Sequence, residues 1–244
     1  MSELKIHAVW DAGTRWFHWI NVLCIIGLAG VGTVILNAGA LGVTGAGKVS
    51  LKTLHTWIGY AFAANLLWRL VWAWCGNRYA RWRAILPGGS GYPGALRAYL
   101  AALIGGRPEP YVGHNPAGRL AVAVLLLLLA VQALTGLVLA GTDLFMPPFG
   151  GWIAQWVAAP GVPPATLVPY APEMYDKIAY ESMRALRKPV VTTHYYNFFI
   201  LIAVIVLHVA GVVVTELREG GNLVSAMLTG RKIIAGRAVD EDRP

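Results

Sequence analysis

Two histidines, His194 and His208, lie fourteen residues apart in one apolar stretch of the sequence. Fourteen residues make nearly four turns of an α-helix, so both imidazoles would face the same side of that helix. A rise of about 1.5 Å per residue separates them by roughly 21 Å along the helix axis. That distance would place one imidazole near each face of a hydrocarbon core about 30 Å thick.

Two further apolar segments each carry a histidine near one end, His18 and His55. Neutral imidazole nitrogen is a good ligand for haem iron. Four histidines at two depths could therefore bind two haems, each held by two axial imidazoles. An iron with two axial histidines has no open position for dioxygen or substrate, so such a centre would transfer electrons.

The composition indicates a membrane protein, because 57% of the 244 residues are hydrophobic and only 13% are charged. A typical soluble domain carries about 25% charged residues. An apolar run of about 20 residues is long enough to span a bilayer as a helix. We therefore expect an all-α integral membrane protein, a single domain over residues 1–244 built as a bundle of four transmembrane helices. The expected spans cover about residues 16–36, 53–76, 119–141 and 190–215.

The distribution of Lys and Arg predicts how the chain is oriented in the membrane. Thirteen of the 20 Lys and Arg residues lie in segments on the same side as the N-terminus, and six lie in the outer loops. The positive-inside rule thus favours a bacterial inner-membrane protein with both termini in the cytoplasm, a cytoplasmic tail at 216–244 and a long periplasmic loop at 142–188. The N-terminal residues are too polar for a cleavable signal peptide. The net charge of +8 follows this topology and does not indicate binding to nucleic acid.

The topology gives each histidine a depth and so predicts which histidines pair. His18 and His208 would lie toward the inner face of the membrane. His55 and His194 would lie toward the outer face. We therefore expect an inner haem held by the first pair and an outer haem held by the second.

Other residues bear on which cofactors the chain could bind. Arg69 interrupts the apolar residues of the second span, where it would either snorkel to the lipid headgroups or pair with a haem propionate. Cys24 and Cys75 have no CxxCH motif, which excludes covalent haem c, and two cysteines cannot hold a four-cysteine iron–sulfur cluster. His7 and His114 fall outside the spans and are not expected to be ligands.

Five motifs stand out along the chain, VWDAGTRWFHW, LHTWIGYAF, WCGNRYARW, RPEPYVGHNPAGRLAV and NLVSAMLTGRK. Together they resemble the bacterial four-helix dihaem cytochrome b family, over about residues 8–140 and 189–232. This family includes the cytochrome b subunits of membrane-bound nickel–iron hydrogenases and relatives that partner periplasmic c-type cytochromes. The haem-ligand positions of the family match His18, His55, His194 and His208.

The resemblance implies two non-covalently bound haem b groups and the role of an electron-transfer subunit in an oxidoreductase complex. Such proteins pass electrons between a periplasmic redox partner and the membrane quinone pool. AVWDAGTRWFHW and RPEPYVGHNPAG are closer to the relatives that partner c-type cytochromes, and the outer loop at 142–188 is longer than expected for the hydrogenase subunits. Both kinds of partner therefore stay open.

Three other functions fit parts of the pattern. A stand-alone quinone-linked oxidoreductase would act on a small periplasmic redox species such as superoxide, without a partner protein. A membrane anchor would carry its haems as structural groups, and its complexes would stay active after haem loss. A haem-free transporter or receptor would have no Soret absorbance.

Overall fold

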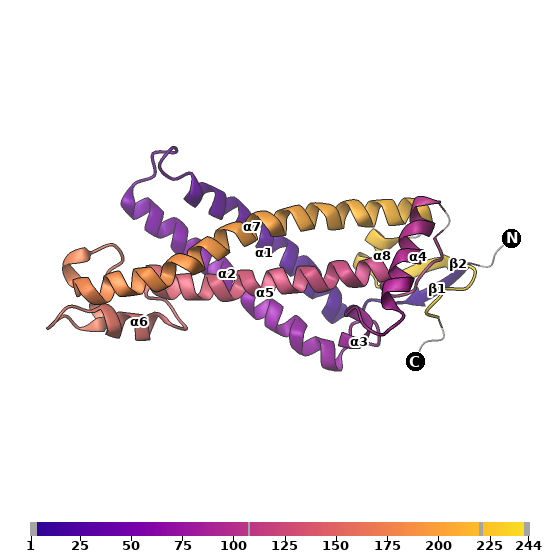
Figure 1. Ribbon diagram of the computed structural model, residues 1–244, viewed down its shortest axis with the longest axis horizontal. Coiled ribbons are helices and arrows are strands. Elements are labelled where there is room, and N and C mark those ends of the chain that lie inside the picture. Colours follow the sequence, from indigo (N-terminus) through magenta and orange to yellow (C-terminus); the bar gives the residue numbers. More distant parts are fainter. Residues whose placement is uncertain (1–3, 107, 220–221, 242–244) are drawn as a thin grey trace. The chain divides into compact units, whose positions relative to one another are not determined.

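The computed structural model describes residues 4–106, 108–219 and 222–241. The described strands are β1 (Leu4–Ala8) and β2 (Arg231–Ala235), and two short 3-10 turns cover Pro164–Thr166 and Pro172–Met174 (Figure 1). The fold is therefore mostly helical, as the composition predicts. The helices are α1 (Ala12–Leu36), α2 (Gly45–Cys75), α3 (Trp82–Ile85), α4 (Tyr92–Ile104), α5 (Pro116–Leu144), α6 (Gly150–Val157), α7 (Lys177–Glu219) and α8 (Leu223–Thr229).

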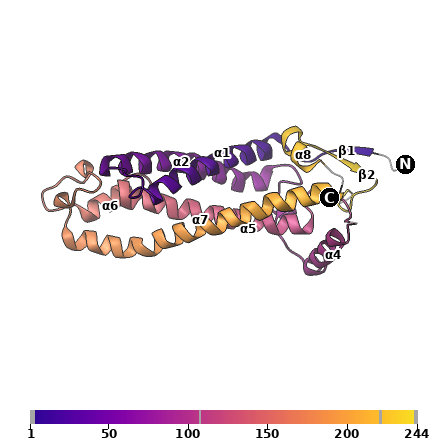
Figure 2. The ribbon, with the colours of Figure 1, turned by 90° about the horizontal axis from the view of Figure 1, so that it is seen from above.

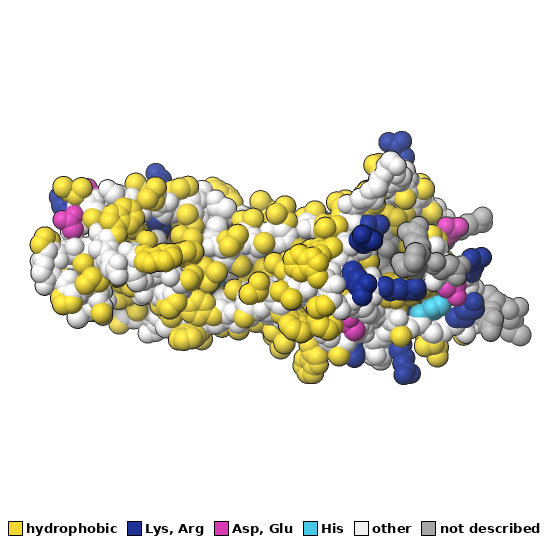
Figure 3. Space-filling view, turned by 90° about the horizontal axis from the view of Figure 1, so that it is seen from below, with side chains coloured by type: hydrophobic (Ala, Val, Ile, Leu, Met, Phe, Trp, Pro, Cys, Tyr) yellow, Lys and Arg dark blue, Asp and Glu magenta, His cyan; other side chains and the backbone are white. Residues whose placement is uncertain are grey.

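Three of the helices, α1, α5 and α7, are long and apolar enough to cross a membrane. Large apolar side chains point outward from them, and Leu23, Leu127 and Leu207 are 70%, 65% and 69% exposed. Hydrophobic side chains cover much of the visible surface of the long helices (Figure 3). Apolar surface of this extent is costly in water, whereas a helix satisfies its own backbone hydrogen bonds in lipid.

The second expected span lies in α2, whose apolar stretch is less hydrophobic than those of the other three long helices. α2 has 31 residues, and Lys48, Lys52 and Arg69 lie within it. It is not among the helices of the described residues that qualify as spans by length and composition. Length and composition thus identify three crossings, and the fourth crossing stays a prediction.

The chain divides into two compact units. Unit one comprises residues 1–20, 66–128 and 200–244. Unit two comprises residues 21–65 and 129–199. Each of the four long helices contributes residues to both units, and the two units are described one at a time.

A two-stranded antiparallel sheet in unit one corrects the all-α prediction. Leu4 pairs with Ala235 and Ala8 pairs with Arg231, so β1 and β2 lie side by side, next to α8 (Figures 1 and 2). Each strand has only five residues and mixes charged with apolar side chains. A sequence of this kind is typical of a polar tail rather than of a strand. A small hydrophobic core adjoins the sheet and consists of Val9, Tyr79, Val112, Ile234 and Ala238.

Asp11 links the start of α1 to the end of α2 within unit one. Its carboxylate accepts hydrogen bonds from the backbone N–H groups of Thr14 (2.8 Å) and Asn77 (3.0 Å) and from the indole N–H of Trp72 (3.1 Å). Burial raises the pKa of Asp11, but these hydrogen bonds outweigh burial and hold the pKa below its ordinary value. Gly13 lets the indole approach, because a Cβ there would lie 2.7 Å from Trp72 Cε2. Two of the sequence motifs thus meet in one helix-capping structure.

In unit two, the residues that follow α5 form a folded segment, and the expected outer loop is shorter than 142–188. This segment contains α6 and the two 3-10 turns, and Val157, Tyr175 and Met183 form its core. α7 begins at Lys177, well before residue 190, where the fourth span was expected to start. A proline inside a helix usually ends or kinks it, whereas α7 accommodates Pro189 and continues to its end at Glu219.

Candidate functional site

His55 of α2 and His194 of α7 face each other within unit two. Their ring centroids lie 6.4 Å apart, and the ring planes are inclined by 73°. Two metal–imidazole bonds of about 2.0–2.1 Å on opposite sides of one metal place the ring centroids roughly 6 Å apart. The structure therefore brings together the two histidines expected as the outer pair, at a spacing that suits one metal between them.

Glycines let both of these imidazoles lie against neighbouring helices. A Cβ at Gly32 of α1 would lie 3.3 Å from His55 Cε1. A Cβ at Gly136 of α5 would lie 3.4 Å from His194 Cε1. Because the interior is closely packed, a larger side chain at either position would displace the ring that it meets.

A polar network between α5 and α7 holds His194. The Thr135 hydroxyl lies 2.9 Å from His194 Nδ1, and the Gln132 amide nitrogen lies 3.1 Å from His194 Nε2. Asn197, one turn further along α7, donates to the Gln132 side-chain oxygen at 2.7 Å. These polar groups lie on otherwise apolar helices, so they satisfy one another's hydrogen-bonding capacity away from water.

The donors and acceptors of this network determine the tautomer of His194. The Thr135 hydroxyl donates its one proton to the Val131 carbonyl at 2.7 Å, so it accepts from His194 Nδ1–H. Nε2 of His194 then carries no proton, and its lone pair accepts from the Gln132 amide. An imidazole whose Nε2 carries no proton is a form that can bind a metal, here in place of the Gln132 amide.

Sequence reasoning missed this network, although the sequence contains a signal for it. Gln132 and Thr135 are three residues apart on one apolar helix, and His194 and Asn197 are three residues apart on another. Residues three apart lie on the same side of a helix, so two such polar pairs indicate facing polar sides.

The two histidines expected as the inner pair both lie in unit one, His18 on α1 and His208 on α7. The His18 ring packs edge-on against Trp19 with centroids 5.0 Å apart, and His18 Nδ1 is buried without a hydrogen-bond partner among the described residues. Three residues after His208, a Cβ at Gly211 would have no atom within 4 Å. The expected inner pair thus consists of two imidazoles. His18 contributes a buried ring nitrogen without a partner, and there is open space one helical turn from His208.

Arg69, expected either to snorkel or to pair with a propionate, is buried in unit one. It is only 4% exposed, and its Nη2 donates to the Ala80 carbonyl at 3.1 Å. Its guanidinium carbon lies 5.9 Å from the ring centroid of Phe17, and among the residues that the structure describes its buried Nη1 has no hydrogen-bond partner. A buried guanidinium with an unused N–H group suits an anionic partner better than it suits contact with the headgroups.

His114, in the turn before α5, adds a neutral imidazole to unit one. Burial lowers the pKa of His114 to about 3, and the charges of Arg69 and Lys232 act in the same direction. Its Nδ1 is buried without a hydrogen-bond partner, and its ring lies 4.7 Å from the ring of Trp10. His114 therefore belongs to the interior of unit one, a position that the sequence did not reveal.

The two histidine pairs fit haem better than a metal ion held by side chains alone. Within the part of the chain that the structure describes, no group of three or more His, Cys, Asp or Glu is placed to hold a metal ion. Next to His55, a Cβ at Gly59 would have no atom within 4 Å, and His55 Nδ1 is buried without a partner. Paired imidazoles with open space on the same helix faces suit a flat macrocycle with two axial histidines.

Comparison with known proteins identifies the family. Residues 9–230 match the family described as prokaryotic cytochrome b561. The chain is 26% identical to the "Probable Ni/Fe-hydrogenase B-type cytochrome subunit" of Cupriavidus necator, over 94% of this chain and 88% of that protein. The protein of the same name from Azotobacter vinelandii is also 26% identical, over 97% of this chain and 90% of its own length.

A third relative is more similar over a shorter region. The "Probable Ni/Fe-hydrogenase 1 B-type cytochrome subunit" of Escherichia coli K12 is 32% identical, over 54% of this chain and 60% of that protein. No solved structure gives a significant match. The region that matches the family contains all four paired histidines. The chain therefore belongs to the prokaryotic cytochrome b561 family of membrane proteins that carry electrons on haem b.

Proposed function

We propose that this chain is a dihaem membrane cytochrome b that carries electrons across the bacterial inner membrane, between a periplasmic redox partner and the quinone pool. The observation that carries the proposal is the pairing of His55 with His194, whose ring centroids lie 6.4 Å apart. His18 and His208, which both lie in unit one, would supply the second haem site. Membership of the family supports haem b as the bound group.

The proposed architecture has four transmembrane helices with both termini in the cytoplasm. The 31 residues of α2 would extend about 46 Å at 1.5 Å per residue, more than the hydrocarbon thickness of about 30 Å. Lys48 and Lys52 lie near the start of α2 and Arg69 lies near its end, which leaves the middle of the helix uncharged. Lys and Arg side chains gather over the part of unit one that holds α4 and the sheet, which supports a cytoplasmic position for that part (Figure 3).

The protein's own residues would hold the haem and exclude water from it. Haem with two axial imidazoles supplies one-electron redox chemistry without an open coordination position. Thr135 would keep the proton of His194 on Nδ1, so that the unprotonated Nε2 could bind iron in place of the Gln132 amide. Arg69 offers a buried N–H group to a propionate in unit one. The apolar long helices keep water away from both histidine pairs.

The names of the relatives bear on the partner. Each of the relatives described above is named as a cytochrome subunit of a Ni/Fe hydrogenase, which supports a nickel–iron hydrogenase as the periplasmic partner. A periplasmic c-type cytochrome is the alternative partner. In either case the chain would act as the electron-transfer subunit of an oxidoreductase complex, and quinone would be the redox partner within the membrane.

A dithionite-reduced minus oxidised spectrum of the purified chain, with haem quantified per chain, tests the proposal. We expect two haem b groups per chain, and the loss of one haem in each of His208→Ala and His55→Ala. His7→Ala changes a histidine outside the long helices and should keep both haems. Absence of Soret absorbance in a haem-loaded sample, or two haems in both ligand variants, would contradict the dihaem proposal.

Quinone reduction in vesicles tests the role of the chain as a conduit. With purified hydrogenase or reduced c-type cytochrome outside the vesicles, electrons should reach quinone in the wild type and fail to do so in His208→Ala. Quinone reduction with superoxide and no partner protein would favour a stand-alone oxidoreductase instead. Full activity of the complex after haem loss would favour a structural role for the haems.

A further inference from the structure

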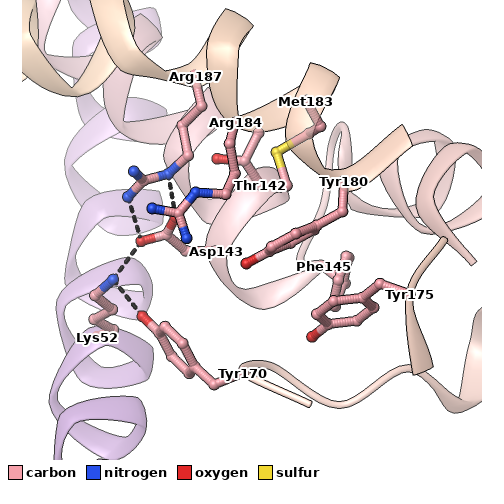
Figure 4. A pocket seen from close by; sticks show the side chains of 10 residues that line it. All are labelled: Lys52, Thr142, Asp143, Phe145, Tyr170, Tyr175, Tyr180, Met183, Arg184 and Arg187. Carbon is pink, nitrogen blue, oxygen red and sulfur yellow. Dashed lines mark hydrogen bonds and ion pairs between the residues drawn. The ribbon is translucent and has the colours of Figure 1, made fainter. Parts of the chain in front are cut away.

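A cavity of about 120 Å³ in unit two has no role in the function proposed above. It lies where α2, α5 and α7 come together outside the histidine pair, and Figure 4 shows the side chains that line it. Its charged lining consists of Lys52, Asp143, Arg184 and Arg187, and Tyr170 is among the aromatic residues around it. Three basic side chains thus surround one carboxylate.

Asp143 is shared by two of these cations. Arg187 donates to both carboxylate oxygens, through Nε and through Nη2 at 2.9 Å, and Lys52 Nζ donates to Oδ2 (Figure 4). The three side chains are mostly buried, with 13% of Asp143, 21% of Lys52 and 22% of Arg187 exposed. Arg184 adds a third cation, with its guanidinium carbon 5.9 Å from the ring centroid of Tyr180.

The cavity lining therefore carries two more positive charges than negative charges. Arg184 is exposed, whereas Lys52 and Arg187 are mostly buried, and a charge removed from water is costly unless an opposite charge pairs with it. Lys and Arg bind carboxylates through short, charge-assisted hydrogen bonds. A ligand with two carboxylates would balance the charge of the cavity.

The cavity lies on the same helix faces as the outer histidine pair. Lys52 precedes His55 by three residues on α2, and Arg187 precedes His194 by seven residues on α7. These spacings place each cation on the same side of its helix as the histidine. On α5, Asp143 lies two turns beyond the glycine that faces His194. One to two turns, about 5–10 Å, therefore separate the cavity lining from the pair along the helices.

We infer that this cavity binds the two propionate carboxylates of the haem held by His55 and His194. The inference rests on the proposed function, because it requires haem at this pair. Haem carries two propionates at one edge of the ring, and their two negative charges match the surplus of the cavity. Lys52 and Arg187 would donate to them, and Asp143 would hold the two cations in position.

An acidic side chain of a partner protein is the other possible source of a carboxylate. The burial of Lys52 and Arg187 favours a resident ligand, because a docking protein meets exposed cations first. Lys188, the neighbour of Arg187 on α7, is such an exposed cation. It also provides a matched control, because its substitution removes one positive charge from the same turn without altering the cavity lining.

Redox titration of the purified holoprotein tests the inference, with the outer haem assigned through His55→Ala. Arg187→Gln removes a positive charge and should favour the oxidised outer haem, lowering its ratio of reduced to oxidised form at a fixed potential. One charge at about 10 Å in a medium of effective dielectric about 20 corresponds to a change of roughly tenfold. Asp143→Asn removes a negative charge and should raise the same ratio. Lys188→Gln should leave it within about twofold of the wild type.

Haem dimethyl ester, whose propionates are blocked, provides the second test. The apoprotein should take up the ester at the outer site at least about tenfold more weakly than it takes up haem, and Arg187→Gln should reduce that difference. Titration of the wild type with succinate tests the external source. A succinate-dependent shift of the outer haem would mean that the cavity is open to external carboxylates, and it would overturn the inference.

The outcomes separate this inference from the proposed function. Absence of haem in the wild type would contradict the proposed function itself. Two haems per chain, with equal outer potentials in Arg187→Gln, Asp143→Asn and Lys188→Gln and equal uptake of the ester, would overturn the propionate site alone. Binding of the inner haem in the same sample shows whether each variant is folded. If Arg187→Gln does not fold, the redox titration of Asp143→Asn provides the test.

Discussion

The Thr135 hydroxyl oxygen lies 2.9 Å from His194 Nδ1 and gives its own proton to the carbonyl of Val131. His194 is thereby held as the Nδ1–H tautomer by a helix that carries no histidine. His55 differs, because its Nδ1 is buried without a hydrogen-bond partner. The two histidines of one pair are therefore held by different means, and a change on α5 should affect only one of them.

Thr135→Val removes the hydroxyl and keeps nearly the same side-chain volume. Loss of the outer-shell partner of a metal ligand typically costs roughly 10–100-fold in affinity, and we expect a decrease of that size for the outer haem. Titration of the apoprotein with haem, followed by visible absorbance, measures the affinity. Thr135→Ser keeps the hydroxyl and should behave as the wild type. Equal affinities in the valine and serine variants would mean that the hydroxyl does not position His194.

Gly32→Ala should disturb the same histidine pair, but at His55 rather than at His194. The added Cβ would lie 3.3 Å from His55 Cε1, so the ring must move by a few tenths of an ångström. We expect altered g-values of the outer haem in its electron paramagnetic resonance spectrum and an unchanged inner haem. Gly39→Ala is the control, because a Cβ there would have no atom within 4 Å. Identical spectra for both variants would show that His55 tolerates the added methyl group.

Asp11→Asn should destabilise unit one by about 1–3 kcal/mol, because a carboxylate that accepts several hydrogen bonds is replaced by a neutral amide. The pKa of Asp11 is below its ordinary value of about 4 in the folded protein. Its contribution to stability is therefore complete above that value and is lost as the pH falls through the folded pKa. Thermal unfolding in detergent between pH 7 and pH 3 should show that the wild type is more stable than Asp11→Asn at neutral pH and that this difference in stability shrinks in acid. A difference in stability that does not change with pH would contradict this role of Asp11.

His114 should make the protein less stable in mild acid. Its pKa is about 3 in the folded protein, whereas an unfolded histidine has a pKa of about 6.5. Above pH 6.5 both states are neutral at this residue, and below it only the unfolded chain binds the proton. The free energy of unfolding should therefore fall by about 1.4 kcal/mol per pH unit as the pH drops below 6.5.

Thermal unfolding of His114→Asn measures this effect, because the variant has no group that titrates at this position. Its stability should depend less on pH between 6.5 and 4 than the stability of the wild type. His7→Asn, which changes the histidine of β1, is the control for a general effect of removing histidine. Parallel pH profiles in the wild type and His114→Asn would contradict the assignment.

The proximity of His55 and His194 could be predicted because the position of a residue along a helix follows from counting residues. His55 near the start of α2 and His194 in the first half of α7 meet in unit two for this reason. The number of crossings is harder to predict, because the apolar stretch of α2 is less hydrophobic than those of α1, α5 and α7 and contains Arg69. A helix of that length can place its charges near its ends, which composition alone does not reveal.

Contacts between distant segments account for what the sequence did not reveal. Gln132 has no visible partner along the chain, and its partners are His194 and Asn197 of another helix. The early start of α7 depends on packing of the same kind, since Met183 in its first turns belongs to a core with Tyr175. Periodicity detects the faces of a helix, but it does not identify which faces meet.

The pairing of β1 with β2 also has a consequence for the order of events during synthesis. β1 is translated before the helices described above, and β2 follows more than two hundred residues later, after all the long helices. The sheet can therefore close only on a chain that has been translated through β2. A chain released before that point would leave the edge of β1 unpaired, and an open strand edge invites aggregation or proteolysis. The small sheet would thus distinguish chains that reach β2 from chains that are released before it.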